Sequence, residues 1–209
     1  MVKLFVEGGG DNNPSLATAC RKGFTKFITQ AGICNRPKVI ACGSRITAFK
    51  DYCTAIKKGE LALLLVDSEA PIDDKLEQGA PETWQPWVHL KQRQGDEWTK
   101  PENAENIDCH LMVQCMEHWI LADPKTLEKF YGKDFNKHRL PSTTPHEKID
   151  KSAVELGLKM ATKDTAKGEY NKGKHSFELL AGIDPELVLA KSDWAKRFVT
   201  ELKKRMDGQ

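Results

Sequence analysis

Residues 61–66 form the longest apolar run in the chain, LALLLV, and this run limits the possible folds more than any other feature. Six residues are far too few to cross a bilayer. A short run that is apolar at every position is typical of a strand buried on both faces, as in the centre of a parallel sheet. Parallel strands need long crossover connections, usually helices, so the run predicts an α/β protein.

The segments before this run alternate between strand and helix patterns. Residues 2–6 and 38–42 are short apolar strands, whereas residues 14–31 repeat apolar side chains at helical spacing. A second helix is predicted between a cap at Ser44 and a stop at Gly59. The order β-α-β-α-β, with connections of crossover length, predicts a parallel sheet flanked by helices.

The second half is predicted to add an insertion and a helical extension. Residues 70–108, with four prolines and three tryptophans, form an insertion with one short helix, and residues 109–113 form a fourth strand. We therefore expect an α/β core over residues 1–125 and a helical part over residues 126–209 that packs on it. The five tryptophans are spread along the chain, so we expect most of them in the core or at interfaces rather than stacked on bases. Helices after the fourth strand are expected at residues 116–122, after Pro124 through Tyr131, and at residues 147–162, 174–182, 185–191 and 193–206.

Composition excludes some classes of protein and leaves others open. With 39% apolar and 30% charged residues, the chain is expected to fold around a core rather than to be disordered. It has no signal-peptide pattern and no membrane-spanning segment, and its six cysteines include no CxxC pair, so we expect a cytoplasmic protein with reduced thiols. The net charge of +2 weighs mildly against tight, independent DNA binding, because phosphate contacts supply most nonspecific affinity.

The first candidate site is the segment VEGGGD after the first strand, which carries Glu7 and Asp11. Ligands of open parallel sheets bind outside the carboxyl ends of the strands, where two carboxylates can hold a hard cation such as Mg²⁺. The glycines allow a tight turn and a close approach to a ligand. Two other interpretations stay open, namely incidental acids in a loop and a turn that binds a nucleotide phosphate. Against the second, the segment matches neither GxGxxG nor GxxxxGK[ST], and a carboxylate at its start repels an anion.

The second candidate is Asp67-Ser68-Glu69, directly after the apolar run. Alternate residues of an extended backbone point the same way, so Asp67 and Glu69 face the same space as Glu7 if the first and third strands are neighbours. Converging carboxylates raise each other's pKa unless a cation neutralises them. An acid after a strand is often only a cap or a loop charge, but acids from two strands together favour a site for Mg²⁺ or Mn²⁺.

Two further stretches carry candidate residues. Glu117 opens the helix after the fourth strand and is either another metal ligand or a first-turn acid favoured by the helix dipole. Lys172, Lys174 and His175 precede an amphipathic helix, whose amino terminus is a good seat for a phosphate. The alternative for these basic residues is a solvated loop.

The segments VEGGGD and LLLVDSE resemble the two signature motifs of the TOPRIM domain, which topoisomerases, bacterial primases and nucleases of the OLD family (overcoming lysogenization defect) share. In this resemblance Glu7 matches the acid that serves as metal ligand or general acid/base, and Asp11 matches the second acid of the OLD-type motif. Asp67 and Glu69 match the metal-binding pair. The resemblance covers roughly residues 1–125 and implies a TOPRIM-like sheet.

The whole chain further resembles small, stand-alone TOPRIM-like proteins that are often encoded beside ABC/AAA-type ATPases in bacterial phage-defence and abortive-infection systems. The stretches HLMVQCMEHWILADP and KGEYNKGKHSFELL add to this likeness. It implies a Mg²⁺- or Mn²⁺-dependent endonuclease, or a toxic effector, that is gated by an ATPase partner and acts on DNA or RNA. By analogy with OLD-type nucleases, Lys174 or Lys172 would stabilise charge on the scissile phosphate.

The likeness to topoisomerases is incomplete, because Pro71 stands where a third acid is often found. Two other functions also stay open. One is a non-catalytic TOPRIM-like regulatory subunit of an ATPase complex. The other is a small-molecule phosphotransferase or phosphohydrolase that uses the same acids.

Overall fold

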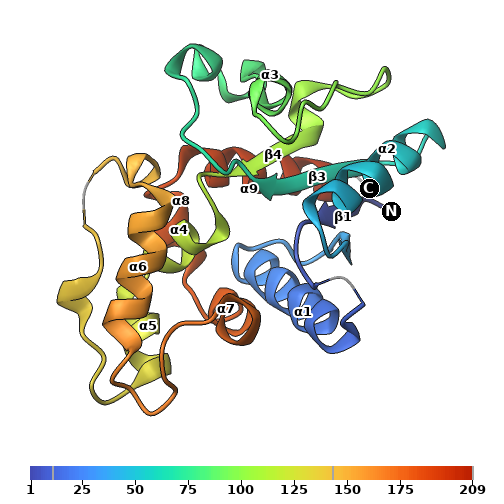
Figure 1. Ribbon diagram of the computed structural model, residues 1–209. Helices are drawn as coiled ribbons and strands as arrows, with labels where there is room; N and C mark the ends of the chain where they lie inside the picture. Colours follow the sequence, from blue (N-terminus) through green and yellow to red (C-terminus); the bar gives the residue numbers. More distant parts are fainter. Residues whose placement is uncertain (11, 143, 209) are drawn as a thin grey trace.

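The protein is built on a four-stranded sheet in which neighbouring strands run parallel (Figure 1). A computed structural model describes residues 1–10, 12–142 and 144–208. In chain order the strands are β1 (Lys3–Val6), β2 (Lys38–Ala41), β3 (Ala62–Asp67) and β4 (Cys109–Met112). Their spatial order is β2-β1-β3-β4, so β1 and β3, the strands that precede the predicted acids, lie side by side at the centre. The predicted α/β fold with a parallel sheet is confirmed.

Strand β3 is buried along its whole length, as its composition predicts. Its side chains alternate between the two faces of the sheet, because successive residues of a strand point in opposite directions. Leu63 and Leu65 belong to one apolar cluster, whereas Leu64 and Val66 belong to another on the opposite face. Both faces of the sheet must therefore be covered by helices.

The first four α-helices of the described chain cover both faces. They are α1 (Pro14–Gln30), α2 (Arg45–Lys57), α3 (Pro86–Gln92) and α4 (Met116–Leu121). Residues of α1 and α4 join the apolar cluster of Leu63, whereas residues of α2 and α3 join that of Leu64, so the two pairs lie on opposite sides of the sheet (Figure 1). Asn13 and Ser44 cap α1 and α2, which begin where their cap residues predict.

The C-terminal helices share a core with the sheet. They are α5 (Pro124–Tyr131), α6 (Lys151–Thr162), α7 (Lys172–Leu180), α8 (Pro185–Leu189) and α9 (Asp193–Asp207). One apolar cluster contains Leu4 of β1, Leu180 of α7 and Phe198 of α9, and therefore runs across the boundary expected at residue 125. Helix α7 crosses α1 at Gly23, where a Cβ atom would come within 2.8 Å of the Phe177 carbonyl oxygen. The helical part thus packs directly on the α/β core.

The insertion over residues 70–108 consists of short 3₁₀ turns and α3, and it packs with α2. Trp98 stacks on Phe49 of α2 with ring centroids 4.4 Å apart, and the indole of Trp87 donates to the Glu105 carbonyl oxygen at 3.0 Å. All five tryptophans are at most 7% exposed, so the expectation that they are core residues is confirmed.

Two further observations bear on the expectations from composition. The cysteines are free thiols, and Cys34 is the exposed one. Over the described residues, no helix combines the length and the apolar character that a bilayer crossing requires.

Candidate metal centre

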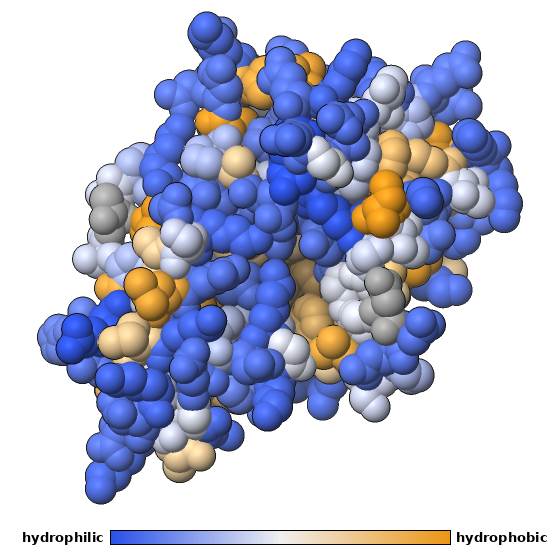
Figure 2. All heavy atoms as spheres, in the orientation of Figure 1, coloured by the Kyte–Doolittle hydropathy of each residue, from blue (hydrophilic) through white to orange (hydrophobic). Residues whose placement is uncertain are grey.

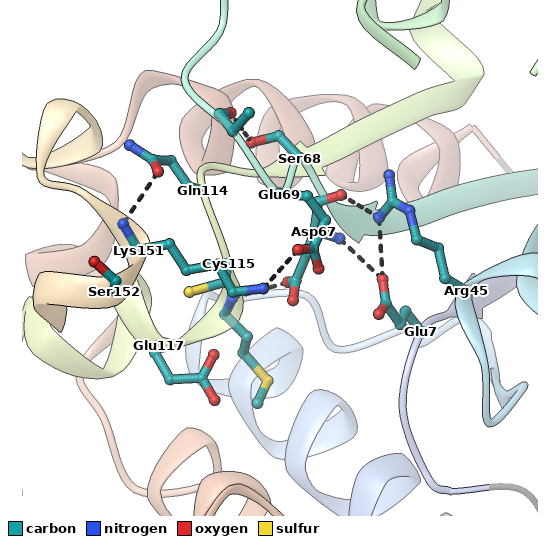
Figure 3. A network of polar contacts seen from close by, with 12 residues as sticks. Glu7, Arg45, Asp67, Ser68, Glu69, Gln114, Cys115, Glu117, Lys151 and Ser152 are labelled. Carbon is teal, nitrogen blue, oxygen red and sulfur yellow. Dashed lines mark hydrogen bonds and ion pairs between the residues drawn. The ribbon is translucent and has the colours of Figure 1, made fainter. Parts of the chain in front are cut away.

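The carboxyl ends of β1 and β3 bring three of the predicted acids together. Glu7 follows β1, Asp67 ends β3, and Glu69 lies two residues further on. One carboxylate oxygen of each lies within 4.8 Å of the others, which is close enough for a single cation to bridge all three (Figure 3). The convergence predicted from the strand order is therefore present in the structure. Asp11, the fourth predicted acid, lies outside the described residues.

Asp67 is the most buried of the three, with 2% of its surface exposed. Its Oδ1 accepts the Met116 backbone N–H at 2.9 Å, and its Oδ2 lies 3.4 Å from the Lys172 ammonium. Burial raises the pKa of Asp67 to about 7, and the charges of Glu7, Glu117 and Glu69 act in the same direction, against Lys172. A carboxylate held in this way gains from an additional positive charge.

Glu7 is held by the backbone and by an arginine. Its Oε2 accepts from the Asp67 backbone N–H at 3.4 Å and from Arg45 Nη1 at 3.2 Å. The glycines that follow it serve close packing. Gly8, at φ 121°, has no room for a Cβ because Phe177 of α7 would lie 2.8 Å away, and Gly9, at φ 98°, lies equally close to α1.

Glu69 reaches the site by a turn rather than by strand alternation. Strand β3 ends at Asp67, and Glu69 has a φ of 65°, in the left-handed region. Its backbone N–H donates to the Gln114 carbonyl oxygen at 2.8 Å, which ties it to the chain leaving β4. Its Oε2 lies 2.7 Å from Lys151 Nζ and 3.9 Å from Arg93. Glu69 lies beside Glu7 and Asp67, as the sequence predicts. The predicted reason is wrong, because Glu69 does not continue the extended backbone of β3.

Glu117 lies next to this group, in the first turn of α4, and is fully buried. Tyr170 donates its hydroxyl to Oε1 at 2.8 Å, whereas Oε2 has no hydrogen-bond partner and lies 3.4 Å from Lys172 Nζ. Burial favours the neutral acid, but Lys172 and the Tyr170 hydroxyl outweigh it and lower the pKa of Glu117. A buried carboxylate oxygen that has an ion pair but no hydrogen bond is a group that a ligand can satisfy.

The three predicted basic residues separate in the structure. Lys172 lies between Asp67 and Glu117, and although burial opposes it, these acids raise its pKa. Lys174 instead lines a groove between α1 and α7. His175 packs against Tyr131, whose hydroxyl donates to Nδ1 at 3.0 Å, and burial lowers the pKa of its imidazole. Within the described part of the chain, His175 therefore has aromatic neighbours instead of the acids.

The sequence patterns did not predict the basic side chains Arg45 and Lys151 of the site, or the acid Asp96 that holds Arg45. Arg45 donates through Nη1 to the Asp67 carbonyl oxygen as well as to Glu7, and Asp96 of the insertion holds its Nε and Nη2 at 2.7 and 2.6 Å. Arg45 directly follows the Ser44 cap beyond β2, so the sequence was sufficient to predict that it lies at this edge of the sheet. Asp96 and Lys151 come from an irregular loop and a distant helix, for which the sequence carries no signal.

The donor set of the site suits a hard divalent cation. Its candidate ligands are carboxylate oxygens, which Mg²⁺ and Mn²⁺ prefer over softer donors. A cavity of about 230 Å³ opens onto Glu7 and Asp67 and is also lined by Lys172 and the glycines after β1. The cavity thus combines cation ligands with a positive charge, the combination that a phosphate bound to a metal requires.

Comparison with known proteins gives one match. A family model described as "Domain of unknown function (DUF4276)" matches residues 6–203, a span that includes β2, β3, β4 and the acids of the site. Neither the curated proteins nor the solved structures contain a match to the chain. Because the family model covers nearly the whole length, the chain belongs to the DUF4276 family.

Proposed function

We propose that this protein is a nuclease-type effector that cleaves phosphodiester bonds of nucleic acid with Mg²⁺ or Mn²⁺. The observation that carries the proposal is the convergence of Glu7, Asp67 and Glu69, whose ligand atoms lie within 4.8 Å at the carboxyl ends of parallel strands. Lys172, beside two of the acids of the site, adds the positive charge that phosphate chemistry needs.

The side chains have distinct roles in this proposal. A divalent ion held by Glu7, Asp67 and Glu69 would polarise a phosphate oxygen and lower the pKa of an attacking water. Lys172, whose side chain is 52% exposed, can turn from the acids toward a bound phosphate and stabilise its developing charge. Arg45 orients Glu7 through the contact at 3.2 Å, and Tyr170 fixes Glu117, which faces Lys172.

The biological setting is part of the same proposal and rests on the resemblance to TOPRIM-like proteins. Glu7 and the segment DSE lie at the carboxyl ends of two adjacent strands, β1 and β3, where the TOPRIM acids are expected. We infer a cytoplasmic effector of anti-phage defence that is gated by an ABC/AAA-type ATPase. The net charge of +2 agrees with action inside a complex, where a partner adds basic surface.

The test compares two glutamates at opposite ends of the sheet. Glu7→Gln removes a proposed ligand, whereas Glu60→Gln removes an acid that pairs with Lys3 at the amino ends of the strands. With Mn²⁺, plasmid DNA and total RNA are incubated with each protein, and Mn²⁺ binding is followed by calorimetry. Glu7→Gln should lose about 100-fold or more of the cleavage rate, and Glu60→Gln should cleave normally. Equal cleavage by Glu7→Gln and the unsubstituted protein would remove the assignment.

A second candidate is a non-catalytic regulatory subunit of an ATPase complex, and one observation favours it. Each described acid of the site already has a basic neighbour in this chain: Glu7 has Arg45, Glu69 has Lys151, and Asp67 and Glu117 share Lys172. Such a site can be stable without any metal. Co-purification with an ATPase, together with no Mn²⁺ binding and no cleavage, would support this function over the nuclease.

A further inference from the structure

The cavity at the acids continues into a second groove between α1 and α7. The first has a volume of about 230 Å³ and the second about 430 Å³. Leu16, Gly173 and Phe177 line both, so the two cavities adjoin each other. Figure 2 shows the surface hollowed between these two helices, with apolar residues at the base and hydrophilic residues on the rims.

The second groove is lined by lysines that have no acidic partner. Lys22 and Lys26 of α1 and Lys174 of α7 are exposed, and none forms an ion pair with another described residue. This differs from the acid site, where Lys151 and Lys172 lie against carboxylates. Glu178 is the acid that lines the groove, so its rim carries a surplus of positive charge.

The arrangement of these lysines suits a chain of phosphates better than a single phosphate. Lys22 and Lys26 lie one helical turn apart, roughly 6 Å along α1, and the two lysines and Lys174 lie on opposite sides of the groove. A small phosphate compound bound at Asp67 would fill the acid cavity and leave these charges unused. A polymer that extends from the acids along the groove would meet all three.

We infer that this groove binds the phosphodiester backbone of a single polynucleotide strand and leads it to the acids. The inference rests on the proposed nuclease function and adds the path of the substrate. A single strand is required because Asp67, 2% exposed, lies in a cavity of about 230 Å³. A separated strand can bend to bring one phosphate into such a space, whereas base pairing holds the backbone of a duplex in its helical path.

The test neutralises the groove and compares it with a matched surface. Lys22, Lys26 and Lys174 are replaced together by glutamine, and the control replaces the exposed Lys50, Lys57 and Lys58 at α2, on the opposite side of the sheet. Fluorescence anisotropy then measures binding of labelled single-stranded DNA, single-stranded RNA and duplex DNA of one sequence. The buffer contains EDTA, so the result does not depend on a metal at the acids.

The groove variant should bind single strands roughly tenfold or more weakly than the control variant, and the slope of log affinity against log salt should fall by about 2, which is 0.7 for each of three lysines. A preference for single-stranded DNA or for single-stranded RNA supports the inference and shows whether the substrate contains deoxyribose or ribose. Unchanged affinity and slope in the groove variant, or no binding by the unsubstituted protein, would overturn it. Tighter binding of the duplex would overturn the assignment to a single strand.

A separate measurement distinguishes failure of this inference from failure of the proposed function. Hydrolysis of bis(p-nitrophenyl) phosphate with Mn²⁺ is compared between the unsubstituted protein and Glu7→Gln. This small diester reports on the acids without needing a groove. Hydrolysis without strand binding would refute the groove alone, whereas strand binding without hydrolysis would refute the nuclease and leave the protein as a binding subunit.

Discussion

Two buried polar networks lie at opposite ends of β4, and they are satisfied in different ways. At the amino end, Arg197 is 3% exposed and donates to the carbonyl oxygens of Pro81, Asn106 and Cys109 and to Nδ1 of His110, at 2.7 to 3.0 Å. Within the described residues, its hydrogen-bond acceptors are all neutral. Burial lowers the pKa of Arg197 to about 10. This network ties the insertion and α9 to the strand.

The network beyond the carboxyl end is made of charges. Glu7, Asp67, Glu69 and Glu117 lie among basic side chains, Glu117 Oε2 lies 3.4 Å from Lys172 without a hydrogen bond, and Lys172 is half exposed. Among the described side chains, each network contains one buried atom without a hydrogen bond, His110 Nε2 beside Arg197 and Glu117 Oε2 beside Lys172, so the two differ in charge. Neutral partners surround Arg197, whereas the acid network holds like charges together, which costs stability unless cations neutralise them.

The largest expected effect is a loss of stability on Arg197→Met. Methionine keeps much of the apolar contact but removes the donors. The carbonyl oxygens of Pro81 and Asn106 then keep only a backbone donor each, and that of Cys109 loses its side-chain donor. The free energy of unfolding should fall by about 3 kcal/mol or more, as measured by urea denaturation.

The control for this substitution is Lys196→Met, at the preceding exposed position of α9, which should change stability by no more than about 0.5 kcal/mol. If Arg197→Met and Lys196→Met proved equally stable, the Arg197 network would not be the structural element described here.

A smaller effect, of opposite sign, is expected for Asp67→Asn. The raised pKa means that the folded state disfavours the charged form, and asparagine keeps the Oδ1 that accepts from Met116. Above the folded pKa of about 7, the neutral side chain should therefore stabilise the protein by about 1–2 kcal/mol.

The same substitution should abolish Mn²⁺ binding, and calorimetry on the variant measures this together with its melting temperature. The exposed Asp164→Asn serves as control and should change neither property. If Asp67→Asn instead destabilised the protein, the acid network would stabilise the fold, as the Arg197 network does.

Local patterns predicted much of the fold and the centre of the site. The LALLLV run identified β3, and the rule that ligands bind at the carboxyl ends of parallel strands brought Glu7 and Asp67 together before any coordinates. Cap residues located most helix starts within a few positions. These features depend on neighbours along the chain, which is why a sequence can report them.

The residues that the sequence misplaced depend on contacts between distant segments. Helix α7 begins at Lys172, capped by Asn171, rather than at residue 174. Two positions turn a helix by roughly 200°, so Lys172 faces the acids while Lys174 faces α1. Asp96 reaches Arg45 from the insertion, 51 residues away, and no periodic pattern encodes such a pair.

The smallest expected effect concerns Glu147. Its titration distinguishes the effect of burial on the pKa of an acid from the effect of charged neighbours. Its carboxylate accepts from the Ser192 hydroxyl at 2.5 Å. Its hydrogen-bond partner is therefore neutral, as are the acceptors around Arg197, but Glu147 is an acid like Asp67. Burial raises the pKa of Glu147 from 4.5 to about 7, and the charges of Glu77 and Asp193 contribute. Between these two values the folded state holds a proton that the unfolded chain has lost.

The free energy of unfolding should therefore fall as the pH rises from 4.5 to about 7, by about 1 kcal/mol after allowance for partial exposure. Glu147→Gln should remove this pH dependence. The buried histidines titrate in both proteins, so the difference between the two curves of unfolding free energy against pH gives the contribution of Glu147 alone. The exposed Glu186→Gln, as control, should leave the curve unchanged. If Glu147→Gln kept the same slope, burial alone would not raise an acid's pKa in this protein, and the raised pKa of Asp67 would have to come from its charged neighbours. The charge pairing of the acid network, rather than its depth, would then distinguish it from the network of Arg197.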